Sequence, residues 1–123
     1  INVVERQRLQ DMGFDPDACL RWVSTEDETA DHDFESVDEL GQAIIIEVKA
    51  TAGAGASIRI SRREFQRAVS AGSSYWLYHV THVETAQPNL FRYPDPVRLW
   101  LDGEITLEFD RMVMSLPKVA SSP

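Results

Sequence analysis

The sequence has a single cysteine, Cys19, and no apolar run long enough to cross a bilayer. One thiol excludes an internal disulfide framework and is typical of a reducing compartment, so we expect a cytoplasmic protein without a membrane span. No secretory signal peptide is visible. The chain starts at Ile1 rather than at a methionine, which suggests a piece of a longer protein.

Basic residues are also scarce. Lys and Arg number 12 against 20 Asp and Glu, and the formal net charge of −8 argues against binding nucleic acid through overall charge alone. Four of the basic residues are nevertheless close together, with only one acid among them: Arg59, Arg62, Arg63 and Arg67 around Glu64. Contact with phosphates and a plain solvated face are equally good interpretations of these arginines.

What the sequence does contain is enough for one globular domain. Its 123 residues are 43% hydrophobic, which is ordinary for a chain that folds around its own core. We therefore expect residues 1–123 to form a single domain of the α/β or α+β class. Its mixed sheet would be built around a central hairpin, with helices on the faces of the sheet.

The most informative stretch is residues 44–51, IIIEVKAT. Its β-branched, apolar beginning predicts a central strand that is buried on both faces. Side chains alternate along a strand, so Glu47 and Lys49 should point to the same side. Charged groups on a buried strand need a partner or a ligand. We infer a carboxylate that can hold a divalent cation and an ammonium that can face a phosphate or an attacking water.

A magnesium ion usually takes one or two carboxylates, so a second acid should lie near Glu47. Residues 32–37 are predicted to form the preceding strand, and a turn joins it to residues 44–51. If the loop of this turn has three residues, Glu39 to Gly41, with Gly41 in the left-handed conformation, Asp38 faces Gln42. Counting outward then places Asp33 directly opposite Glu47. A loop one residue longer or shorter would turn Asp33 to the other face.

Asp33 followed by Glu47-Val48-Lys49 resembles the PD-(D/E)xK nuclease superfamily. More narrowly, the motif order resembles a domain of unknown function, the one at the C-terminus of the plant protein NO VEIN. The similarity rests on four short segments taken together, because each one alone is common. They are DHDFES at 31–36, IEVKAT at 46–51, ISRREF at 60–65 and YWLYHV at 75–80. One departure is His32, which stands where the superfamily often has proline.

The resemblance implies a restriction-endonuclease-like core that depends on Mg²⁺ or Mn²⁺. Asp33 and Glu47 would hold the metal together with the backbone carbonyl of Val48, and Lys49 would orient the water or stabilise charge on the phosphorane. DNA is the implied substrate, with RNA left open. Fusion to a helicase, an ATPase or another defence or restriction protein is also implied, and a homodimer stays open.

Other functions compete with a nuclease. The same fold could be a non-catalytic module that binds nucleic acid or a protein, which the net charge favours. It could also be an assembly domain in which Glu47 and Lys49 simply form a salt bridge. A further acid, Glu5, is a weak site candidate because relatives often begin with a helix that carries a glutamate near the site. A solvated surface glutamate is the better interpretation.

Local patterns predict the remaining elements. Ser61 and Glu64 form a capping box, which gives Glu64 a structural role at the start of a helix. Asp95-Pro96 predicts a helix through Trp100, and the alternative is a hairpin with its turn at 102–103. The other expected elements are a helix within 1–12, a strand within 18–24, an acidic loop at 26–31, a strand at 57–60, a helix to about 71, a strand at 75–83, a loop at 84–94 and strands within 105–116.

Overall fold

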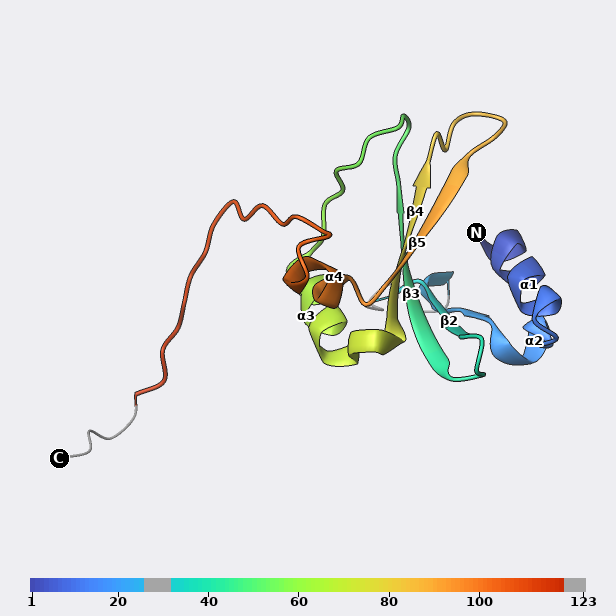
Figure 1. The fold of residues 1–123 in the computed structure, drawn as a ribbon, viewed down its shortest axis with the longest axis horizontal. Coiled ribbons are helices and arrows are strands. Elements are labelled where there is room, and N and C mark those ends of the chain that lie inside the picture. The colour runs from blue at the N-terminus through green and yellow to red at the C-terminus, as the bar shows by residue number, and fades with distance from the viewer. Residues whose placement is uncertain (26–31, 119–123) are drawn as a thin grey trace.

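The computed structural model describes residues 1–25 and 32–118, so the acidic segment 26–31 lies outside the described residues. Figure 1 shows helices packed on both faces of one sheet. In chain order the elements are α1 (Asn2–Asp11), α2 (Pro16–Cys19), β1 (Arg21–Trp22), the 3-10 turn η1 (Val23–Thr25), β2 (Phe34–Val37), β3 (Ala43–Ala50), α3 (Arg62–Ala71), the 3-10 turn η2 (Gly72–Ser74), β4 (Tyr75–Thr81), β5 (Asn89–Pro94) and α4 (Pro96–Leu101).

The sheet is mixed, as the sequence predicted, and its order is β1-β2-β3-β4-β5. Strands β3 and β4 run parallel, while the other neighbours are antiparallel. The parallel pair needs a crossover connection, which α3 supplies. Strand β3 lies in the middle with a partner on each side, which explains its nearly continuous apolar sequence. The protein therefore has the α+β class that we expected.

The predicted register of the β2–β3 hairpin is confirmed. The backbone N–H of Asp38 donates to the carbonyl of Gln42 over 2.9 Å, and Gly41 adopts a left-handed φ of 77°. Phe34 pairs with Ile46, and the N–H of Asp33 donates to the Ile46 carbonyl over 2.9 Å. The paired register ends at Phe34 and Ile46, so Asp33 lies one residue beyond it, beside β3 but outside the strand pairing that would set it opposite Glu47.

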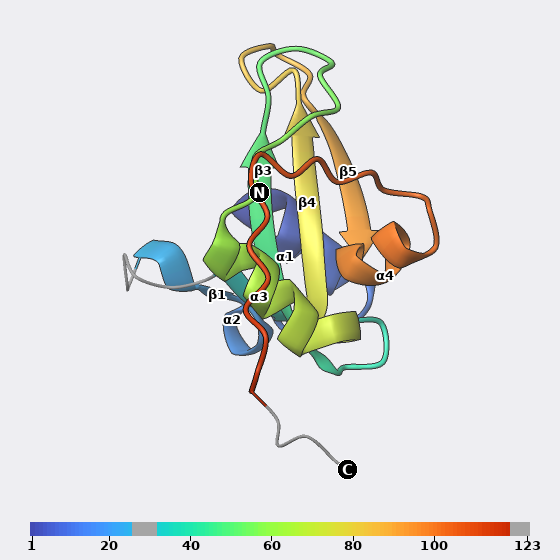
Figure 2. The same ribbon diagram turned by 90° about the vertical axis from the view of Figure 1, so that its left-hand side faces the viewer.

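The helices are divided between the two faces of the sheet. Figure 1 shows α1 and α2 on one side and α3 and α4 on the other, and Figure 2 shows α3 in front of β3 and β4 with α1 behind them. The main core lies on the α1 side, where the buried cluster contains Phe34, Ile44, Ile46 and Tyr78. Glu47 and Lys49 alternate with these positions along β3, so they face α3.

Glu5 is not a surface residue, and the structure corrects that expectation. The residue is 0% exposed, and its carboxylate accepts hydrogen bonds from Arg8, Ser36 and Tyr78. Burial alone would raise its pKa, but these hydrogen bonds together keep the pKa of Glu5 below its ordinary value. Its partners lie on the α1 face of the sheet. Glu5 is therefore on the opposite face from Glu47 and does not join the candidate site.

Several predicted strands differ from the structure. Within 18–24 only Arg21–Trp22 is a strand, because Asp15 and Pro16 begin the short helix α2 and its Asp15 carboxylate accepts from the N–H of Asp17. Residues 57–60 form no strand, since β3 already pairs with β2 and β4 on its two edges. The loop expected at 84–94 instead contains β5, which pairs with the open edge of β4.

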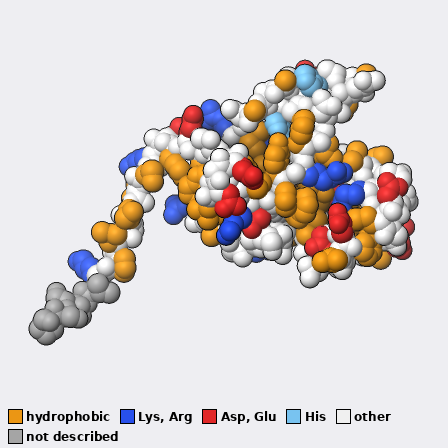
Figure 3. Space-filling view, viewed as in Figure 1, with side chains coloured by type: hydrophobic (Ala, Val, Ile, Leu, Met, Phe, Trp, Pro, Cys, Tyr) orange, Lys and Arg blue, Asp and Glu red, His pale blue; other side chains and the backbone are white. Residues whose placement is uncertain are grey.

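For the C-terminal region, one prediction is confirmed and another is wrong. The helix predicted from Asp95-Pro96 is confirmed as α4, and the Asp95 carboxylate accepts from the N–H of Arg98 over 3.2 Å. No strand forms in the described part of 105–116, so that expectation was wrong. Figures 1 and 3 show this stretch projecting away from the sheet with hydrophobic side chains along it. The most exposed of them are Met112, Val113, Met114 and Leu116.

Candidate functional site

Glu47 and Lys49 lie side by side near the end of β3, as the alternation of side chains predicted. The ammonium nitrogen of Lys49 is 3.7 Å from Oε1 of Glu47. It also donates hydrogen bonds to both carboxylate oxygens of Glu64, over 2.9 and 2.8 Å. The lysine thus stands between an acid of its own strand and an acid of α3. Both contacts are partly shielded from water, which strengthens them relative to surface ion pairs.

Asp33 joins this group from the residue just before β2. Its Oδ2 atom accepts a hydrogen bond from the backbone N–H of Val48 over 2.8 Å. This bond fixes the carboxylate beside β3 at the level of Glu47 and Lys49. The Val48 side chain itself belongs to the opposite face, where it packs against the main core. Of the predicted site residues, Asp33, Glu47, Val48 and Lys49 are therefore brought together by one pair of strands.

The environment of Glu47 disfavours its charged form. The residue is 8% exposed, and this burial, with a hydrogen bond to Glu64, raises the pKa of Glu47 to about 9. The negative charges of Asp33 and Glu64 act in the same direction, whereas the Lys49 ammonium lowers the pKa. Two carboxyl groups therefore flank one ammonium, and the charge of Asp33 is near enough to act on Glu47. A site with this excess of acid is one that a divalent cation would relieve.

Glu64 is the site residue that sequence reasoning assigned to structure alone. Its capping box is confirmed: the N–H of Ser61 donates to Oε1 of Glu64, and the N–H of Glu64 donates to the Ser61 hydroxyl oxygen. The same carboxylate also binds Lys49. Burial would raise its pKa, but hydrogen bonds from Glu47, Lys49 and Ser61 lower the pKa of Glu64 to about 2. The Ser-x-x-Glu signature predicted where α3 begins, but it gave no information on how close Glu64 lies to β3.

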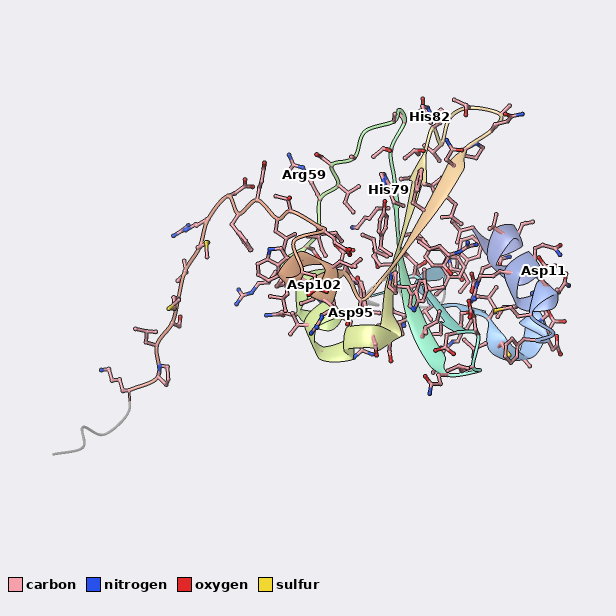
Figure 4. The ribbon with its side chains drawn as sticks, viewed as in Figure 1. Asp11, Arg59, His79, His82, Asp95 and Asp102 are labelled. Carbon is pink, nitrogen blue, oxygen red and sulfur yellow. The ribbon has the colours of Figure 1, made fainter. Side chains whose placement is uncertain are left out.

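A second neighbour of the lysine is His79. It pairs with Lys49 across the parallel strands β3 and β4, so both side chains share the α3 face. His79 is buried, and its Nε2 atom lies 3.1 Å from the hydroxyl of Thr51. In Figure 4 it lies toward the same end of the sheet as His82. Strand periodicity alone could not place His79 beside Lys49, because the pairing of β3 with β4 joins residues far apart in the sequence.

The four arginines lie on the α3 side of the molecule. Figure 4 shows Arg59 on the segment that leads from β3 to α3, while Asp11 marks the opposite side on α1. Arg62 and Arg63 are exposed in the first turn of α3, and Arg67 is half-buried one turn later. Because α3 also contributes Glu64, these basic side chains belong to the element that borders the candidate site.

The side chains of Asp33 and Glu47 fit a magnesium ion that takes two carboxylates as its protein ligands. Magnesium usually binds one or two protein carboxylates and keeps water or substrate in its other positions. Asp33 and Glu47 supply that number. Within residues 1–25 and 32–118, no group of three or more His, Cys, Asp or Glu side chains is arranged to hold a metal ion. A site closed entirely by protein ligands is therefore not present in that part of the chain.

Comparison with known families decides the relationship that the motifs suggested. The family model described as Protein NO VEIN, C-terminal, matches residues 2–93, which is well over half of the chain. The chain belongs to this family. The match to the NO VEIN C-terminal family includes β1 to β4, all but the last residue of β5, and every member of the candidate site. The family description names no activity, so membership of the wider nuclease superfamily stays a hypothesis.

No curated protein and no solved structure matches the chain. Among the described residues, no helix has both the length and the apolar character that crossing a membrane would require. The function of the domain must therefore be argued from its site.

Proposed function

We propose that this domain hydrolyses phosphodiester bonds of DNA with the help of Mg²⁺ or Mn²⁺. The observation that supports the proposal is the convergence of Asp33, Glu47 and Lys49 across the β2–β3 hairpin. Two acids and an amine held by paired strands are the groups that this reaction needs. The resemblance of the motif order to PD-(D/E)xK nucleases agrees with this assignment.

Each site residue would have its own role in the proposed hydrolysis. Asp33 and Glu47 would hold the metal, assisted by the carbonyl of Val48 as the resemblance implies. A bound metal would lower the pKa of a water molecule and neutralise phosphate charge. The bond from the Val48 N–H keeps the Asp33 carboxylate in place before any ion binds. Lys49 carries a positive charge toward the position where negative charge develops on the phosphorane, and such preorganised charge is often the largest catalytic contribution.

The choice of substrate follows from the surroundings of the site. Helix α3 contains Arg62, Arg63 and Arg67 and follows Arg59, so it can supply local positive charge that the net charge of −8 does not provide. We take DNA as the substrate, with RNA as the competing one. From the single cysteine we propose a cytoplasmic location. Following the resemblance, we propose fusion to a helicase, an ATPase or another component of a defence or restriction system, and a homodimer is a compatible assembly.

The proposal is tested by incubating supercoiled plasmid with the protein in the presence and absence of Mg²⁺ or Mn²⁺. The wild type should nick the plasmid only with metal. Asp33→Asn, Glu47→Ala and Lys49→Ala should each lose about 10²–10³-fold in rate while the protein stays folded by thermal denaturation. Glu35→Gln is the matched control, since Glu35 lies on β2 and pairs with Arg21 instead. Metal-dependent nicking that survives Lys49→Ala would contradict the assignment.

One observation favours the non-catalytic alternative. The Lys49 ammonium is already paired with Glu64, so it is not waiting unpaired for a phosphate. A module that only binds DNA or a protein would show no metal-dependent nicking as the wild type. It would still lose stability when one member of the Lys49–Glu64 pair is removed, because the other charge would stay partly buried.

A further inference from the structure

We propose that Glu64 is the positioning residue of this site, and that it fixes the Lys49 ammonium so that its remaining N–H faces the scissile phosphate. The inference rests on the hydrolytic function proposed above. It concerns a residue that the motif order does not assign to the site.

The contact between the two residues is bidentate. Lys49 donates to Oε1 and to Oε2 of Glu64 over 2.9 and 2.8 Å. An ammonium has three N–H donors, and this contact uses two of them. The direction of the third is then set by the other two. Glu47, at 3.7 Å from the same nitrogen, is beyond hydrogen-bond distance.

Glu64 is itself held rigidly. It is the third residue of α3, and its Oε1 atom accepts the N–H of Ser61 over 2.8 Å while its own N–H donates to the Ser61 hydroxyl oxygen. This reciprocal cap fixes the side-chain rotamer. The partial positive charge at the start of a helix also favours a carboxylate there. The first turn of α3 therefore holds the Glu64 carboxylate in a fixed position next to the Lys49 ammonium.

Lys49 needs a fixed partner because its side chain is a flexible four-carbon stem that ends in a compact charge. Without Glu64, the nearest acid described in the structure is Glu47, which is a proposed metal ligand. A lysine that turned toward Glu47 would compete with the cation for the same carboxylate. By binding the ammonium from the other side, Glu64 keeps the lysine within the site and out of hydrogen-bond distance of Glu47.

The test compares Glu64→Gln with Ser61→Ala. Glutamine also works at this position of a capping box, so Glu64→Gln should stay folded, with a lower thermal midpoint, while it removes the charge opposite Lys49. We expect kcat for plasmid nicking to fall about 10²-fold with KM nearly unchanged, as for a misplaced catalytic group. Ser61→Ala should lower the midpoint, yet retain most of kcat because the Lys49–Glu64 contact persists. In a Lys49→Ala background, Glu64→Gln should have no further effect on kcat.

A second measurement does not depend on activity. The sequence has two lysines, Lys49 and the exposed Lys118, so an ¹⁵N spectrum of the metal-free protein can resolve their ammonium groups. Hydrogen bonding to Glu64 should slow proton exchange at Lys49 enough for its signal to be seen, with Lys118 as the internal control. Glu64→Gln should abolish the Lys49 signal, and Ser61→Ala should leave it.

The outcomes separate the two proposals. A wild type without metal-dependent nicking overturns both. Nicking that Glu64→Gln leaves unchanged, or accelerates, keeps the nuclease and overturns the role of Glu64, because acceleration would mean that the contact restrains the lysine. A Lys49 signal that survives Glu64→Gln would also overturn it, since the ammonium would then be held by another group.

Discussion

The hydroxyl of Tyr78 donates a hydrogen bond to Oε1 of Glu5 over 2.8 Å, and so ties helix α1 to strand β4 across 73 positions of the chain. Ser36 and Arg8 complete the coordination of the same carboxylate. Arg8 continues to the carbonyl of Val37 on β2. The face of the sheet behind the candidate site is therefore joined by a buried polar network in addition to its hydrophobic core.

Removing the Tyr78 hydroxyl tests this network. Tyr78→Phe leaves the shape of the core nearly unchanged but takes one donor from a buried carboxylate. We expect the free energy of unfolding to fall by about 1.5–3 kcal/mol, the usual value of a hydrogen bond to a charged group. Tyr93→Phe is the matched control on β5, because the described structure records no hydrogen bond from that hydroxyl. Urea denaturation measures both, and equal losses would contradict the role of Tyr78.

The same network should make stability depend on pH. The pKa of Glu5 in the folded protein is below its ordinary value of 4.5, since hydrogen bonds from three residues outweigh the effect of burial. Its contribution is therefore complete above that value and is lost as the pH falls through the lowered folded pKa. Glu5→Gln should be less stable than the wild type near neutrality, with a smaller loss on acidification. Urea midpoints across this window give the answer, and parallel curves would refute the prediction.

The left-handed conformation of Gly41 supports the register that brings Asp33 to Glu47. Gly41→Ala should lower the free energy of unfolding by about 1–2 kcal/mol through backbone strain alone. A Cβ there would meet ring atoms of Phe14 at 3.5 and 3.6 Å, which is ordinary contact. Gly55→Ala is the control, since nothing lies within 4 Å and no left-handed φ is involved. Thermal or urea unfolding that shows no difference between the two variants would argue against this turn.

The arginines of α3 can be tested through the salt dependence of DNA binding. If Arg62 contacts a phosphate, Arg62→Ala should weaken binding to any sequence and reduce the slope of log K against log salt by about 1. Arg6→Ala is the control, because Arg6 lies on α1, on the opposite face, and is hydrogen-bonded to Asp17. Fluorescence anisotropy without divalent metal measures both slopes. An unchanged slope for Arg62→Ala would leave a plain solvated face as the explanation.

The features that could be predicted from the sequence are those set by neighbouring residues. The β2–β3 hairpin follows from Gly41 and from alternation, and the start of α3 follows from Ser61 and Glu64. The helix α4 follows from Asp95-Pro96. In each case a few consecutive residues determine the local hydrogen bonds. The relation of Asp33 to Glu47 could be inferred because a short loop converts a residue count into a spatial register.

The features that the sequence concealed depend on distant partners. Strand β5 forms because β4 has an open edge, and residues 57–60 form no strand because β3 has none. Glu5 has the sequence context of a surface residue, but its partners Ser36 and Tyr78 come from two strands. For the same reason the second role of Glu64 was missed, since the capping signature gives no information about Lys49.

The members of the candidate site come from one continuous stretch, from Asp33 through Lys49 to Glu64. The connector after β3 therefore acts as a tether between Lys49 and Glu64. Its length sets the effective concentration of the Glu64 carboxylate near the Lys49 ammonium. Doubling its length would cost only about 0.6 kcal/mol in closure entropy. The connector could thus change in length at little energetic cost while Glu64 still reaches Lys49.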